Sequence, residues 1–244
     1  MKKGRINEHF DELRKRLYVV VAFFFVCFGI SYFFSSQLYA FLVEPLANIF
    51  AAEGLSRRLI FTDLTEAFVT HIKVAIYAAL CVTTPLLTFQ IYRFIAPGLF
   101  KRERRVALQY MLFSPILFCL GAMLVYFYIM PLAWAFFLSF ETNLASNLPL
   151  VLEAKVSDYL NLSLSLIFAF GITFQLPLVL TLLARVKLIS VDALRKYRRH
   201  AIVINFIVAA ILTPPDVLSQ IALAIPLILL YEISILLCAK IQKV

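Results

Sequence analysis

The sequence predicts an all-α integral membrane protein with six transmembrane helices. Its 244 residues are 63% hydrophobic and only 15% charged, and the mean hydropathy is +0.92. Six apolar segments fill the chain, and the Lys and Arg residues gather on one side of them. A water-soluble domain could not cover so much apolar surface.

The six apolar segments are expected to form one membrane domain over residues 1–244. A bilayer core of about 30 Å needs about 20 helical residues. The predicted spans cover residues 17–36, 68–94, 106–138, 159–184, 200–213 and 217–239. The third is so long that it must tilt, kink at Pro115 or Pro131, or protrude. The fifth is so short that the bilayer thins beside it or neighbouring protein shields its ends.

The basic residues predict the orientation of these spans. Of the 23 Lys and Arg residues, all but Arg57, Arg58, Lys73 and Lys155 fall in the two tails, the second-to-third loop and the fourth-to-fifth loop. By the positive-inside rule, both termini are cytoplasmic. The net charge of +9 is therefore mostly an orientation signal and gives no reason to expect nucleic-acid binding. Basic membrane faces also attract anionic lipid.

Two segments outside the spans are expected to be helical. Asn7 is a candidate N-cap for a helix that precedes the first span, and its apolar residues Ile6, Phe10 and Leu13 would lie along the membrane surface. The first outer connection suggests one or two short amphipathic helices, with Tyr39 and Phe41 at headgroup depth.

The sequence contains no recognisable catalytic set. The histidines His9, His71 and His200 are far apart, and no Gly-rich phosphate loop is present among only 6 glycines. The four cysteines fall inside spans, where small apolar packing residues are expected. We therefore expect no enzymatic activity, no metal and no cofactor.

Two acidic residues could act at the cytoplasmic face. Glu12 lies four residues before Arg16, so a helical ion pair is the simplest interpretation. Glu103 is the only carboxylate in the second-to-third loop. It either balances the neighbouring arginines or accepts an incoming cation.

Polar residues in and near the later spans also leave two interpretations. Gln175 beside Pro177 needs a hydrogen-bond partner in the membrane, either within the bundle or in a cavity. Thr213 and Gln220 flank the third outer turn, where they either cap the turn or bind a partner helix. Asp216 is a candidate cap for the sixth helix.

Several motifs, in order along the chain, resemble TatC, the multispanning subunit of the twin-arginine protein translocase. The first is His9–Leu17, HFDELRKRL. The others are FIAPGL at 94–99, KRERR at 101–105, LTPPDV at 212–217, and the shorter matches Ser219-Gln220 and Ala224-Ile225-Pro226. They cover nearly the whole chain, and together they are highly specific.

The resemblance implies a Sec-independent protein translocase subunit. TatC proteins form a cupped bundle, expected here with short fifth and sixth helices. They bind the twin-arginine signal peptides of folded precursors at the cytoplasmic face. They recruit TatA- and TatB-type single-span subunits for export driven by the proton-motive force, and other copies of the chain are expected partners. The expected location is the bacterial cytoplasmic (inner) membrane, although thylakoids and some mitochondria hold related proteins.

The resemblance also implies roles for individual residues. Glu12 and Glu103 would contact the paired arginines, and Arg14, Phe94 and Pro97 would shape that surface. Thr213 and Gln220 match a polar site for partner helices, and Pro45 and Asp216 match other positions tied to function. Gln175 departs from the family, which often has glutamate there. Because Gln is neutral, a proton-linked role is not expected at this position.

The alternative function is a secondary transporter of a small molecule or ion. Such a protein needs polar groups at mid-membrane on broken helices. Gln175 is the main candidate here, so the sequence favours the translocase.

Overall fold

A computed structural model describes residues 2–52, 59–95, 101–139, 153–185, 188–212 and 217–242. Within these ranges, the side chains of residues 2–10, 52, 92, 94–95, 101–107, 109–110, 218–219 and 241–242 are not described. The described chain is helical apart from short connections and one isolated bridge between Ile60 and Lys155. The all-α prediction is therefore confirmed.

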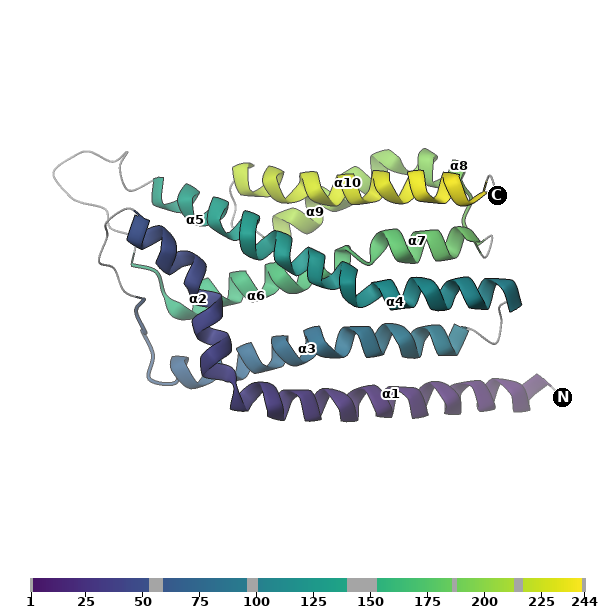
Figure 1. The fold of residues 1–244 in the computed structure, drawn as a ribbon, viewed down its shortest axis with the longest axis horizontal. Helices are drawn as coiled ribbons and strands as arrows, with labels where there is room; N and C mark the ends of the chain where they lie inside the picture. The colour runs from purple at the N-terminus through teal and green to yellow at the C-terminus, as the bar shows by residue number, and fades with distance from the viewer. Residues whose placement is uncertain are drawn as a thin grey trace.

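The N-terminal segment does not form a separate surface helix as expected. A single helix, α1 (Lys2–Phe33), contains both the tail and the first span (Figure 1). Asn7 therefore lies inside a helix, and the prediction that it caps one is wrong. At 32 residues, α1 is about 48 Å long and reaches well beyond a hydrocarbon core.

One helix occupies residues 35–52 of the first outer connection. Helix α2 (Ser35–Ala52) crosses the end of the bundle (Figure 1) and packs against α3 (Glu66–Ile95) and α5 (Met130–Ser139). Its buried side is apolar and includes Leu42, Leu46 and Phe50. Phe41 is 52% exposed, and its position at headgroup depth stays a prediction.

The third and fourth predicted spans are both interrupted. The third consists of α4 (Lys101–Leu124), a π-helical segment η2 (Val125–Ile129) and α5 (Met130–Ser139). The π-helical segment ends two residues before Pro131, which has no N–H for a regular helical bond. The fourth consists of α6 (Val156–Thr173) and α7 (Leu176–Arg185), and it breaks just before Pro177.

The last two helices differ from each other in length. Helix α9 (Arg198–Leu212) has 15 residues, about 22 Å, so the prediction of a short fifth helix is confirmed. Helix α10 (Val217–Gln242) has 26 residues, so the prediction of a short sixth helix is wrong. The predicted 217–239 span omitted residues 240–242, which continue the helix. Within the described ranges, five segments are long and apolar enough to be candidate spans, and α9 is not among them.

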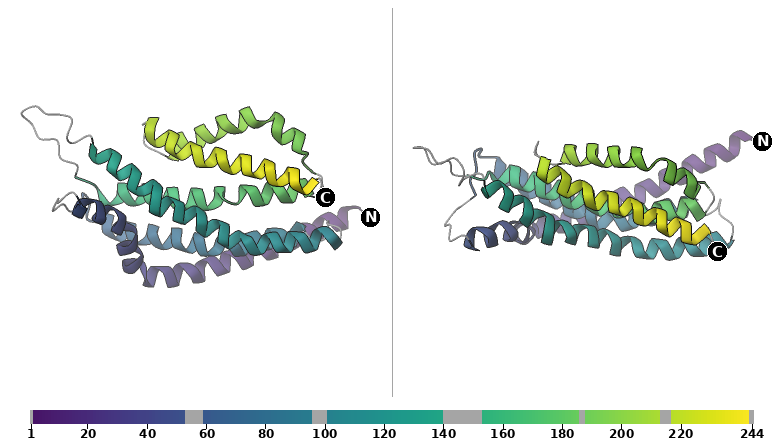
Figure 2. Two further views of the ribbon diagram at one scale, coloured as in Figure 1. Left: turned by 45° about the horizontal axis from the view of Figure 1, so that its top comes forward. Right: turned by 90° about the horizontal axis from the view of Figure 1, so that it is seen from above.

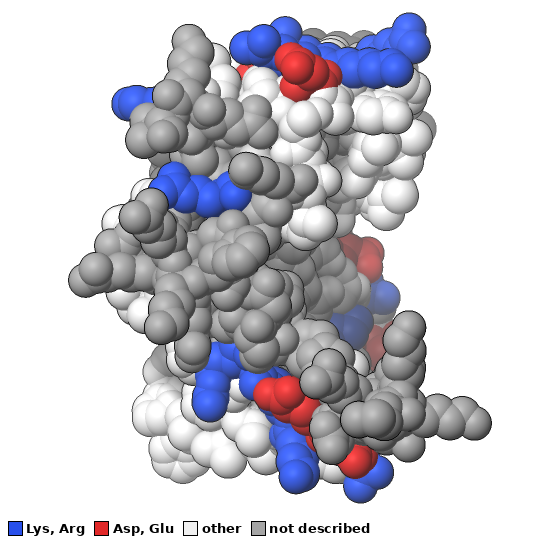
Figure 3. Space-filling view, turned by 90° about the vertical axis from the view of Figure 1, so that its right-hand side faces the viewer, with Lys and Arg blue, Asp and Glu red and all other residues white. Residues whose placement is uncertain are grey.

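The helices alternate in direction, so both chain termini lie at one end of the bundle, here called the terminal end (Figure 1). The opposite end, crossed by α2, is the α2 end. Basic side chains gather along two edges of the terminal end (Figure 3). Those described there lie on α1, α3, α7, α8 (Val191–Lys196), α9 and α10. The basic side chains described at the α2 end are Lys73 and Lys155.

The two sides of the bundle meet at the fourth span. On one side α1 packs against α3 (Glu66–Ile95), and on the other α9 and α10 pack as an antiparallel pair (Figure 2). Helix α6 contacts α3 and α4, and its continuation α7 contacts α10.

Two glycines allow α4 and α6 to approach closely. A Cβ atom added to Gly121 of α4 would lie 2.7 Å from the carbonyl oxygen of Phe170. A Cβ atom added to Gly171 of α6 would lie 2.5 Å from the Phe118 ring. Both are below the normal contact distance. The two glycines therefore set the spacing between these helices.

We predict that Gly121→Ala destabilises the protein by about 1–3 kcal/mol, because the methyl group meets backbone atoms of α6. The measurement is the free energy of unfolding in mixed micelles, titrated with sodium dodecyl sulfate. Gly29→Ala is the matched control, since no heavy atom lies within 4 Å of a Cβ atom there. Equal losses of unfolding free energy in the two variants would contradict the role of Gly121 in the close approach of α4 and α6.

Candidate functional site

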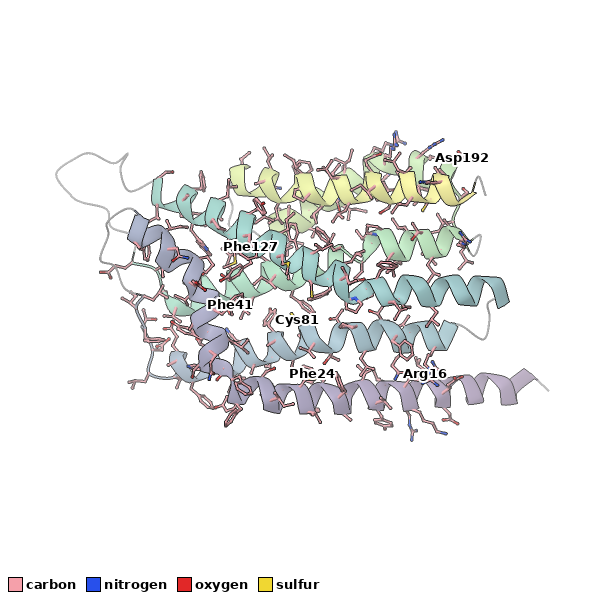
Figure 4. All side chains as sticks on the ribbon, in the orientation of Figure 1. Arg16, Phe24, Phe41, Cys81, Phe127 and Asp192 are labelled. Carbon is pink, nitrogen blue, oxygen red and sulfur yellow. The ribbon has the colours of Figure 1, made fainter. Side chains whose placement is uncertain are left out.

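Glu12 is held in an ion pair near the terminal end. Its carboxylate accepts a hydrogen bond from the Arg16 guanidinium one turn along α1, as the spacing predicted. Arg16 also donates to the Gln90 carbonyl oxygen of α3 at 3.3 Å, and it lies on the side of α1 that faces α3 (Figure 4). The Glu12 side chain remains 41% exposed. A cation arriving from solution can reach Glu12 but must compete with Arg16.

The other residues predicted for this site are described only in part. Glu103 lies in the first turn of α4 and Phe94 in the last turn of α3, both at the terminal end (Figure 1). Their side chains, and all of Pro97, lie outside the described residues. Helix α3 packs against both α1 and α4. The backbone thus brings Glu12 and Glu103 to one end of the bundle, on the two helices that flank α3.

Arg14 is exposed on α1. Its guanidinium carbon lies 5.7 Å from the centre of the Tyr18 ring, within the range of a cation–π contact. The aromatic ring orients the arginine without neutralising its charge.

Gln175 lies in the break between α6 and α7. It is 8% exposed, and its amide nitrogen donates to the Ser114 carbonyl oxygen of α4 at 2.9 Å. This contact confirms the interpretation that Gln175 bonds within the bundle. Its amide oxygen, however, is buried without a hydrogen-bond partner.

A groove of about 390 Å³ runs beside Gln175 between α1, α3 and the fourth span. Its walls are mostly apolar and include Phe24, Leu80 and Ile172. Thr83 also lines it, and its hydroxyl is likewise buried without a partner. A buried polar atom left unpaired costs about 1–3 kcal/mol. Two residues that line the groove thus each carry a buried polar atom without a partner.

Pro45 bends α2 and releases a backbone carbonyl. Proline has no N–H, so the Phe41 carbonyl oxygen lacks its normal helical donor. The Tyr126 hydroxyl, from the π-helical segment, donates to this oxygen at 2.9 Å. The two rings stack with their centres 4.4 Å apart, and Figure 4 shows Phe41 of α2 near the segment that carries Phe127. The Tyr159 hydroxyl donates to the neighbouring Leu42 carbonyl at 2.6 Å.

The predicted partner-helix residues are only partly described. Gln220 of α10 donates from its amide nitrogen to the Phe206 carbonyl oxygen of α9 at 3.2 Å. This bond joins the last two helices. Thr213 and Asp216 lie outside the described residues.

An ion pair fixes the other end of these helices. Arg198 of α9 lies 2.8 Å from Glu232 of α10, and both side chains are more than a third exposed. Among the described residues, no cluster of His, Cys, Asp and Glu could hold a metal ion.

Comparison with known proteins identifies the chain. Residues 8–226 match the family described as TatC, Sec-independent protein translocase protein. The chain belongs to the TatC family. The Sec-independent protein translocase protein TatC of Rickettsia prowazekii is 47% identical over 99% of this chain and 95% of its own length. The TatC protein of Aquifex aeolicus is 35% identical over 95% and 93%.

Solved structures agree with this assignment. A crystal structure of a twin arginine translocase receptor, TatC, superimposes with a TM-score of 0.84 and 34% identity. The superposition covers 96% of this chain and 99% of that one. The chain is thus a multi-pass membrane protein and a component of a protein translocase. TatC proteins are not enzymes.

Glu66 was not predicted as an important residue of this TatC chain. It is 6% exposed, and it accepts hydrogen bonds from the Thr62 amide at 2.8 Å and the Ser157 amide at 2.9 Å. It therefore caps the start of α6 from another helix. A carboxylate at the start of an apolar span can be recognised in the sequence. Its partner, Ser157, lies 91 positions away and cannot be predicted from the sequence.

We predict that Tyr126→Phe costs about 0.5–1.5 kcal/mol of unfolding free energy, because the Phe41 carbonyl loses its donor. In a Pro45→Ala background the cost should be smaller, since the substituted residue supplies the missing N–H. A double-mutant cycle in the same mixed micelles measures this coupling. Tyr128→Phe, on the same π-helical segment and 75% exposed, is the matched control. Additive effects of Pro45→Ala and Tyr126→Phe would disprove the link between the two residues.

Proposed function

We propose that the chain is the receptor subunit that binds twin-arginine signal peptides of folded precursors at the terminal end. The observation that carries the proposal is that Glu12 and Glu103 lie at the same basic end, on the two helices that flank α3. A guanidinium presents a planar fork that meets a carboxylate in bidentate fashion, which an ammonium cannot do. Arg14, Phe94 and Pro97 shape the surface around the two carboxylates.

The two carboxylates alone do not provide enough affinity. An exposed ion pair contributes about 0.2–1 kcal/mol, whereas micromolar binding needs about 8 kcal/mol. The apolar part of the signal peptide therefore supplies most of the affinity, and the carboxylates supply the preference for arginine. The ion pair with Arg16 further reduces the contribution of Glu12 to the binding free energy, because the contact between Glu12 and Arg16 must break before a signal-peptide arginine can bind Glu12.

We propose roles for the remaining sites. The groove beside Gln175 and Thr83 receives a donor from a signal peptide or a partner helix. Thr213 and Gln220 contact TatA- and TatB-type single-span subunits. Pro45 and Asp216 support the same assembly at the α2 end, and further copies of the chain join it. Export then draws on the proton-motive force. The transporter alternative has no comparable support.

The proposal also fixes the topology. All six segments, including the short α9, cross a bacterial cytoplasmic (inner) membrane with the basic terminal end inside. The bilayer thins beside α9.

We predict that Glu103→Gln weakens binding of an Arg-Arg precursor about twofold to fivefold and leaves binding of a Lys-Lys precursor unchanged. The measurement is crosslinking of both precursors from a photoreactive residue at position 102, calibrated by competition. Asp192→Asn, on α8 at the same end (Figure 4), is the control that should change neither. An equal loss for both precursors would refute the arginine-selective role of Glu103.

The topology gives a second prediction. In a chain without its native cysteines, Asp192→Cys should react with an impermeant thiol reagent only after the membrane is opened. Asp63→Cys and Glu153→Cys, at the α2 end, should react in intact spheroplasts. Labelling of position 192 before opening would reverse the proposed orientation.

A further inference from the structure

A second, larger cavity lies at the α2 end, well away from the groove beside Gln175. It has a volume of about 760 Å³ and lies between α2, α5, α6 and α9. This volume is within the range of small-molecule sites. Part of its wall is apolar, including Leu46, Phe137 and Leu212, and part is polar and charged.

The polar part follows one face of α6. Asp158, Asn161 and Ser165 are three and then four residues apart, so they share a helical face. Polarity decreases along this face, from a carboxylate at the start of the helix to a hydroxyl about 10 Å further into the bundle. The cavity is therefore graded in the way that an amphiphile with its head at the α2 end requires.

Charges of both signs surround the mouth of the cavity. Lys155 provides an ammonium, which lies 4.0 Å from the buried carboxylate of Glu66. Glu153 and Asp158 provide two carboxylates. The Asn161 side-chain oxygen Oδ1 accepts a hydrogen bond from the Lys73 ammonium at 2.9 Å, which leaves the side-chain amide N–H groups of Asn161 to serve a ligand. The mouth can thus receive an anionic and a cationic group together.

The short α9 brings lipid to this cavity. It ends at Leu212 after about 22 Å of helix, and Ile211 and Leu212 line the cavity. A bilayer core is about 30 Å thick, so lipid head groups beside α9 are drawn towards the bundle interior. Their depth then matches the polar face of α6.

We propose that this cavity binds one phospholipid whose head group carries a primary ammonium, as in an ethanolamine phospholipid. Lys155 and Asn161 bind the phosphate, and Glu153 and Asp158 bind the ammonium. The acyl chains leave along Phe137 and Leu212. A primary ammonium donates hydrogen bonds to carboxylates, whereas a trimethylated choline head group has no N–H to donate. The site is independent of signal-peptide binding.

The test uses the full chain in nanodiscs with equal amounts of ethanolamine, choline and glycerol phospholipids that share the same acyl chains. Native mass spectrometry after release of the chain measures which lipid stays bound. We expect about one ethanolamine lipid per chain, and retention that is about fivefold lower in Glu153→Gln/Asp158→Asn, which corresponds to about 1 kcal/mol. Lys155→Gln should lower retention of all three lipids.

Asp63→Asn is the matched control, since Asp63 is an exposed carboxylate at the same end that does not line the cavity. It should leave retention unchanged. Equal retention of ethanolamine and choline lipids by the unaltered chain would overturn the proposal without any variant. Loss of the ethanolamine lipid in Asp63→Asn, or no bound phospholipid at all, would also overturn it.

Discussion

A membrane offers no water to backbone carbonyls, and this constraint governs the places where the helices of this protein bend. Each bend releases polar groups that another element must satisfy. Tyr126 donates to the carbonyl released by Pro45, Tyr159 donates to the adjacent Leu42 carbonyl, and the Gln175 amide donates from its helix break to α4. The bends are thus held by side chains from distant parts of the sequence.

Two cavities lie beside these bends. The break at Gln175 opens a groove with two unpaired polar atoms, and the kinked α2 forms one wall of the larger cavity at the opposite level of the bundle. The glycine-mediated approach of α4 and α6 keeps these features fixed relative to one another. The close packing of α4 and α6 thus lies between the groove beside Gln175 and the larger cavity at the α2 end.

The two ends of the bundle differ in their charged residues. The terminal end is strongly basic, yet its proposed receptor function depends on two carboxylates among those cations. The basic residues predict the orientation of the chain in the membrane, and one of them, Arg16, already pairs with Glu12. At the α2 end, Glu66, Lys73 and Lys155 take part in local contacts, and Lys155 also lines the larger cavity.

The sequence alone determined the helical class, the family and the short α9, because each follows from apolar length or local motifs. It also predicted the Glu12–Arg16 pair, which is a contact within one helix. It did not predict the continuous α1, the full length of α10, the π-helical segment or the role of Glu66. Only tertiary structure decided which hydroxyl meets the carbonyl released at Pro45 and which atoms of Gln175 remain unpaired. Those contacts join residues far apart in the chain, and no local pattern specifies them.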